Sequence, residues 1–199
     1  FGLIFSEDII MLILGPAFLQ ADIIFKILLV SICIRSISSP HTVQLMATGH
    51  TNITAKVGGS MFISNIILNL IFIPEELFGF KMLGWGAQGA ALATLTGVIV
   101  LSLICRYYSY KLFKVIAKPK KIISHLLALI ISSLILYLIK ITFDFTFFII
   151  LFPMLILSYV SYFTVMFLTK EIDNKELIFI RENINIRKMK KYIKDNMGA

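Results

Sequence analysis

The chain has 199 residues, of which 58% are hydrophobic and only 15% are charged, and its mean hydropathy is +0.91. Soluble domains carry roughly 45–50% apolar and about 25% charged residues, so this composition excludes an ordinary soluble domain. The formal net charge is +8. Because the basic residues flank long apolar runs, this charge is typical of membrane topology and argues against a nucleic-acid partner.

Residues 1–20 contain Glu7 and Asp8 and no lysine or arginine. They lack the basic stretch, short apolar core and cleavage site of a secretory signal peptide. We expect them to form the end of a preceding helix followed by an interfacial segment on the outer side. We also expect the chain to be the C-terminal piece of a longer protein.

Several apolar stretches are long enough to cross a bilayer, which takes about 20 mostly apolar residues as a helix. They lie at residues 21–46, 54–73, 86–107, 122–139 and 146–168. The predicted fold class is therefore all-α, a polytopic membrane helix bundle over residues 21–169. Pro40 lies in the later half of the first stretch, and Pro153 lies inside the last, where we expect a kink.

The basic residues are distributed unequally between the two sides of the membrane. Six lie between Arg106 and Lys121, and eight follow residue 169, whereas the loops on the other side hold few. The positive-inside rule places the basic loops in the cytoplasm. The chain is thus predicted to be a multi-pass protein of the cell membrane. Its basic cytoplasmic tail, residues 170–199, is interpreted either as an amphipathic helix that contacts anionic membrane lipids or as a solvated basic tail.

Residues 64–97 predict two closely packed helices joined by an outer turn. Pro74 ends the first of them, because proline lacks an N–H and clashes with the preceding turn. The second carries small residues at four-residue spacing in two ridges, one with Gly86, Ala90 and Thr94 and one with Gly89, Ala93 and Gly97. Such ridges let helix backbones approach closely in lipid.

Asn65 and Asn69 share one face of the helix before Pro74, because side chains four residues apart align. Buried amides need hydrogen-bond partners. The pair is interpreted either as interhelical hydrogen-bonding groups or as the polar lining of a sugar-binding cavity, since amides both donate and accept.

Arg35 is the main candidate for function, because an ionisable residue inside the bilayer is costly and is a functional candidate by default. It lies near the middle of residues 21–46, and Ser31, Ser38 and Thr42 fall on the same helical face. This polar stripe suits a water-filled cavity that holds an anionic group. In the alternative interpretation, Pro40 ends the helix early and Arg35 only extends to the cytoplasmic interface.

Lys26 also lies within the first stretch, four residues after Asp22. An ion pair near the outer end of the helix explains it, since side chains at this spacing are neighbours. A lysine that faces the cavity is the alternative.

No pattern for hydrolysis, phosphate binding or zinc chemistry occurs, so we predict no enzyme, no catalytic residue, no cofactor and no metal site. His41, His50 and His125 lie near predicted helix ends and are interpreted as interface or loop residues. Cys33 and Cys105 lie in apolar runs and are interpreted as small buried side chains.

Four segments in order resemble a known family: "LILGPAFLQADIIFKILLVS", "SSPHTVQLMATGHTNITAKVGG", "NIILNLIFIP" and "GWGAQGAALATLTG". Together they resemble the C-terminal half of polysaccharide-biosynthesis (Wzx-like) flippases of the multidrug/oligosaccharidyl-lipid/polysaccharide exporter superfamily. The similarity covers residues 9–97. The turn at residues 74–86 is longer than is usual in the family.

The resemblance implies a transporter of about 12–14 helices in two lobes, of which these helices form most of the C-terminal lobe. The N-terminal half of the same transporter would be its partner. Its substrate would be a lipid-linked oligosaccharide on polyprenyl phosphate or pyrophosphate, moved by alternating access. Family cavities are basic, which would give Arg35 its role.

Two other functions stay open. A multidrug or toxic-compound extrusion transporter of the same superfamily often carries carboxylates within the membrane, whereas the acidic residues here fall at helix ends or outside. A membrane assembly subunit without transport has no need of a desolvated arginine.

Overall fold

The computed structural model describes residues 1–114, 119–142 and 150–169. Within them the protein is an all-α membrane helix bundle, with five helices long and apolar enough to cross a membrane. The predicted tail at residues 170–199 and the predicted start of the last span at residues 146–149 lie outside the described residues. The chain divides into a first unit with α1 to α4 and a second with α5 and most of α6, and each is described by itself.

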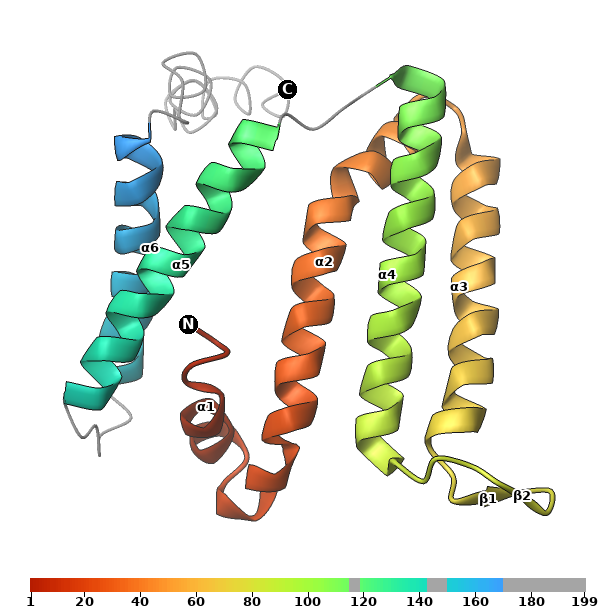
Figure 1. Ribbon diagram of the computed structural model, residues 1–199, viewed down its shortest axis with the longest axis horizontal. Coiled ribbons are helices and arrows are strands. Elements are labelled where there is room, and N and C mark those ends of the chain that lie inside the picture. The colour runs from red at the N-terminus through yellow and green to blue at the C-terminus, as the bar shows by residue number, and fades with distance from the viewer. Residues whose placement is uncertain (115–118, 143–149, 170–199) are drawn as a thin grey trace, which may run out of the picture. The chain divides into compact units, whose positions relative to one another are not determined.

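The first unit is built around three long helices. Its elements in chain order are α1 (Ser6–Ile13), the 3-10 helix η1 (Pro16–Ala21), α2 (Asp22–Ala47), α3 (Thr51–Phe72), β1 (Glu76–Leu77), β2 (Phe80–Lys81) and α4 (Gly86–Phe113). Helix α4 lies between α2 and α3 and packs against both (Figure 1). The start of α2, the end of α3 and the start of α4 lie together with the β1–β2 hairpin, and we call this the hairpin end.

Local residues explain where these helices begin and end. Gly15 has φ 89° and is followed by Pro16 at the first position of η1, which leads directly into α2. Helix α3 ends at Phe72, two residues before Pro74, as predicted from the missing N–H of proline. The predicted starts and ends of the first two spans agree with α2 and α3 to within a few residues.

The structure corrects the predicted end of one helix and places the two prolines Pro40 and Pro153. Helix α4 runs to Phe113 instead of residue 107, because its last turns still bury Ser109 and end only at the left-handed Lys114. Pro40 does not end α2, which continues to Ala47. Helix α6 begins at Leu151, so Pro153 lies in its first turn. A proline in the first turn of a helix costs no intrahelical hydrogen bond.

A buried apolar cluster of the first unit lies at the end opposite the hairpin. Leu45 of α2, Val57 of α3 and Cys105 of α4 form one buried cluster. His50 stacks on Phe113 there, with ring centroids 5.7 Å apart. The C-terminal part of α2 bends toward α4 at this end (Figure 1), which brings the three helices together.

The second unit consists of α5 (Pro119–Thr142) and α6 (Leu151–Leu168). The His125 Nδ1 atom and the Tyr162 hydroxyl lie 2.7 Å apart, and their rings are stacked with centroids 6.3 Å apart. This contact joins the two helices. It agrees with the interpretation of His125 as an interface residue.

Close backbone approach between α3 and α4 depends on Gly89. A Cβ atom built on Gly89 would lie 2.6 Å from the Phe72 carbonyl oxygen and 2.8 Å from its carbonyl carbon. Ala93 is fully buried, and a Cβ on Gly97 would meet Met61 and Asn65 at ordinary contact distances. The predicted ridge of Gly89, Ala93 and Gly97 is therefore the contact surface of α4 toward α3.

We predict that Gly89→Ala destabilises the protein by about 1–3 kcal/mol, because the added methyl group meets backbone atoms that cannot move aside. Thermal unfolding in detergent measures this. Gly59→Ala in α3 is the matched control, since a Cβ there meets nothing within 4 Å. At this exposed helical site alanine should raise stability by roughly 0.5–1 kcal/mol. Equal effects of the two variants would contradict the close approach.

Candidate functional site

The face of α2 that carries the predicted polar stripe is divided between two surroundings. Ser31 and Ser38 are buried, with 4% and 7% of their surface exposed. Ser31 Oγ donates to the Ile27 carbonyl oxygen at 3.0 Å, and Thr42 Oγ1 donates to Cys105 Sγ of α4 at 3.7 Å. Ser31 and Ser38 thus lie in closed helix packing, and the partly buried Thr42 contacts α4.

Arg35 is different, because its side chain is exposed. It lies about 20 Å from the first residue of α2 and about 18 Å from the last, at a rise of 1.5 Å per residue. Among the described residues it has no hydrogen-bond or ion-pair partner. The structure therefore places the guanidinium at mid-length on a spanning helix, at the edge of the buried serine face.

Lys26 forms an ion pair along α2. Its Nζ atom lies 2.6 Å from Asp22 Oδ2, with 40% of the Lys26 side chain and 13% of the Asp22 side chain exposed. This is the helix-end pair predicted from the four-residue spacing. The pair leaves Arg35 as the charged side chain of α2 without a partner in the described residues.

The two amides of α3 bond to each other. Asn69 Nδ2 donates to Asn65 Oδ1 at 2.8 Å, and both residues are partly buried. The Asn65 amide nitrogen lies 3.9 Å from the position of a Cβ on Gly97, so it faces α4. The buried Asn69 Oδ1 atom has no partner among the described residues. The pair lies next to the close contact of α3 and α4, and its two interpretations stay predictions.

A polar cluster that joins α2 to α4 was not predicted. The fully buried Ser109 hydroxyl donates to Gln44 Oε1 at 2.8 Å and lies 3.0 Å from His41 Nδ1. A hydroxyl has one proton, so Ser109 accepts from His41, whose Nδ1 must carry hydrogen. The sequence pattern that could have indicated this cluster is a series of small side chains every three or four residues in α4. They are Ser102, Cys105 and Ser109, and all are buried.

A groove of about 410 Å³ opens at the hairpin end, between η1 with the start of α2 and the start of α4. Each wall contributes one aromatic ring and one carboxamide: Phe18 and Gln20 on one side, Trp85 and Gln88 on the other. The remaining lining residues are Ala17, Ala21, Ile24 and Ala87, so all eight described lining residues are uncharged. Carboxamides donate and accept hydrogen bonds, so the groove suits a neutral hydroxylated group.

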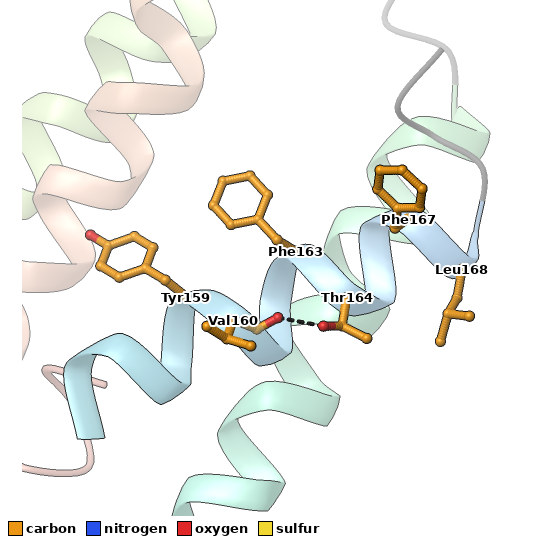
Figure 2. Close-up of a pocket in the computed structure, with 6 residues that line it drawn as sticks. All are labelled: Tyr159, Val160, Phe163, Thr164, Phe167 and Leu168. Carbon is orange, nitrogen blue, oxygen red and sulfur yellow. Dashed lines mark hydrogen bonds between the residues drawn. The ribbon is translucent and has the colours of Figure 1, made fainter. Parts of the chain in front are cut away.

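A second hollow lies along α6 alone. Figure 2 shows its six lining residues, with Tyr159, Phe163 and Phe167 at four-residue spacing and Thr164 donating to the Val160 carbonyl oxygen at 2.7 Å. One helix supplies all six described lining residues, and their surface is almost entirely apolar. Such a surface on a spanning helix is suited to contact with lipid chains and offers no chemistry of its own.

No group of three or more His, Cys, Asp or Glu residues that could hold a metal ion occurs in residues 1–114, 123–142 and 150–169. His41, His50 and His125 contact side chains of neighbouring helices instead. Comparison with known proteins found no matching family model, no matching curated protein and no matching solved structure.

We predict that Ser109→Ala destabilises the protein by about 0.6–2 kcal/mol, because it leaves the Gln44 and His41 side chains without their shared partner. Ser102→Ala is the matched control. It is a buried serine on the same helix, and its hydroxyl has no partner among the described residues. Its removal should cost little. Urea or thermal unfolding in micelles compares the two variants. An equal loss of stability would contradict a contribution from the hydrogen bonds of Ser109.

Proposed function

We propose that this chain is the C-terminal part of a flippase that moves lipid-linked oligosaccharide across the cytoplasmic membrane by alternating access. The observation that carries the proposal is the exposed Arg35 halfway along a 26-residue spanning helix. The resemblance of residues 9–97 to polysaccharide-biosynthesis flippases supports the same substrate.

A guanidinium at this depth needs a compensating anion or water. Translocon-based scales put the cost of arginine at a helix centre at about 2.5–3.5 kcal/mol. The continuation of α2 to Ala47, beyond Pro40, supports a position of Arg35 away from the helix end. A phosphate or pyrophosphate group matches the planar fork of a guanidinium and would be bound through paired hydrogen bonds.

The groove at the hairpin end supports a substrate with two chemically different parts. Ile24 of the groove lies about 16 Å along α2 from Arg35. The charged site would bind the phosphate-bearing part of the substrate, and the uncharged groove with Trp85 and two carboxamides suits hydroxyl-rich sugar residues. A lipid-linked oligosaccharide carries both kinds of group on one molecule.

The distribution of charged residues supports an orientation of the chain in the membrane. The C-terminal end of α4 carries the basic residues Lys111 and Lys114, whereas the hairpin end carries Glu75 and Glu76 beside Lys81. The positive-inside rule then places the hairpin outside and the C-terminus in the cytoplasm. In this orientation the sugar-compatible groove opens on the outer side, where a flipped glycan must leave.

The alternatives differ in what they need from the membrane interior. A multidrug exporter coupled to protons or Na⁺ often uses a carboxylate within the spans. In the described residues the acidic side chains lie at helix ends or outside, as Asp22 does. An assembly subunit would use the tight packing of α2, α3 and α4 without needing an exposed Arg35.

We predict that Arg35→Ala lowers transport about 10–100-fold, because a charge-assisted hydrogen bond is worth about 1.5–3 kcal/mol. The test is complementation by the intact transporter in a host that lacks its own flippase, with the amount of untranslocated lipid-linked oligosaccharide as the readout. Arg35→Lys should keep part of the activity, since it keeps the charge and loses the planar fork.

Lys56→Ala is the matched control, since Lys56 is an exposed basic residue near the start of α3 and should be dispensable. Membrane levels of all variants are compared by immunoblot. Full activity of Arg35→Ala at normal abundance would contradict a role in substrate binding and favour the assembly subunit.

A further inference from the structure

The connection between α3 and α4 is a β-hairpin with an unusual residue at its tip. Strands β1 and β2 pair antiparallel, with Glu76 opposite Lys81 and Leu77 opposite Phe80. The two residues between them, Phe78 and Gly79, have φ values of 53° and 83°. Positive φ at both central positions is the requirement of a type I′ turn, which favours asparagine or glycine at the first of them.

Phenylalanine at this first position is unfavourable for the backbone. Left-handed φ brings the Cβ atom of a bulky residue close to the following carbonyl group. Nothing described in the chain compensates, because 92% of the Phe78 surface is exposed. A strained conformation that holds an exposed aromatic ring points to a function outside the chain itself.

The hairpin separates apolar from charged side chains. Residues directly opposite each other on paired strands point to the same face, and successive residues alternate. Leu77 and Phe80 therefore share one face, and Glu76 and Lys81 share the other. Phe80 is 71% exposed. The hairpin thus has an apolar face that continues into Phe78 and a charged face on the opposite side.

The base of the hairpin is fixed to the ends of two spanning helices. The backbone N–H of Trp85 donates to the Phe72 carbonyl at 2.8 Å, and that of Gly84 donates to the Pro74 carbonyl at 2.8 Å. Because α3 ends at Phe72 and α4 begins at Gly86, these bonds hold the hairpin against the ends of two candidate membrane spans. We expect both helices to leave the hydrocarbon at this end. The polar headgroup layer there is about 5–8 Å thick on each side.

We propose that the hairpin is an interfacial anchor: Phe78 and Phe80 insert into the lipid headgroup region on the hairpin side, with Glu76 and Lys81 facing water. Aromatic side chains favour this layer, and the half-exposed Trp85 at the same end matches it. The anchor stabilises the ends of α3 and α4 against movement along the membrane normal. The inference rests on the spanning helices and is independent of the transported substrate.

The test places a tryptophan at the tip of the hairpin. Trp85, the only tryptophan of the chain, is replaced by phenylalanine, and Phe78→Trp is introduced in that background. The protein is reconstituted in nanodiscs of phosphatidylcholine with bromine atoms near the headgroup end of the acyl chains. We expect blue-shifted emission, severalfold stronger quenching by the brominated lipid than in Lys81→Trp, and weaker quenching by aqueous iodide.

Two results would overturn the anchor. Equal iodide quenching in Phe78→Trp and Lys81→Trp, with no effect of brominated lipid, would place the tip in water. Blue-shifted emission that neither quencher reaches would place the ring against protein, which would make the hairpin a contact with another polypeptide segment.

Amide hydrogen exchange of residues 75–84 in nanodiscs supplies a second measurement, in which turn preference and loss of the anchor predict opposite changes in the exchange rate. Phe78→Asn creates the preferred Asn-Gly sequence of a type I′ turn, so turn preference alone predicts slower exchange. Loss of the anchor predicts faster exchange. Slower or unchanged exchange in Phe78→Asn would therefore count against insertion, and the variant is not expected to misfold.

Discussion

The close approach of α4 to its two neighbours is the contact on which the rest of the first unit depends. Gly89 lets the α3 backbone come so near that a methyl group would meet the Phe72 carbonyl, and Ala93 is fully buried in the same surface. Lipid chains are as apolar as leucine, so burying apolar surface does not drive helices together in a bilayer. Dense packing of small residues and a few hydrogen bonds must do so instead.

The central position of α4 explains its composition. Both of its contact faces are lined by small residues, Gly89, Ala93 and Gly97 toward α3 and Cys105 and Ser109 toward α2. The large apolar side chains, such as Leu103 at 63% exposure, point away from these faces. The same division of side chains by size determines which polar groups enter the packing. Serine hydroxyls fit between helices and bond to a nearby backbone or side-chain group, whereas the larger Arg35 side chain lies exposed.

The two ends of the unit carry different contacts. At one end, His41, Gln44 and Ser109 connect α2 to α4 beside a buried apolar cluster. At the hairpin end, backbone hydrogen bonds at the base of the exposed aromatic hairpin connect α3 to α4. An uncharged groove opens there between α2 and α4. Arg35 lies between these ends. The proposed flippase function uses this order along α2, with a charged site at mid-length and a neutral groove at one mouth.

The sequence by itself determined the spans, because hydropathy, proline and glycine act within a few residues of where they stand. It predicted the end of α3 before Pro74, the ion pair of Lys26 with Asp22 and the small-residue ridge around Gly89, all of which depend on local geometry or helical period. The helical period indicates which residues share a face of a helix. It does not indicate which neighbouring helix, if any, that face contacts. Only the tertiary structure decided that Ser31 and Ser38 are buried while Arg35 is exposed, and that His41 meets Ser109. The physical reason is that the rotation of each helix about its axis is set by packing between residues on different helices, such as His41 and Ser109, which are 68 positions apart. Van der Waals contact and single hydrogen bonds there select among faces that hydropathy leaves equivalent.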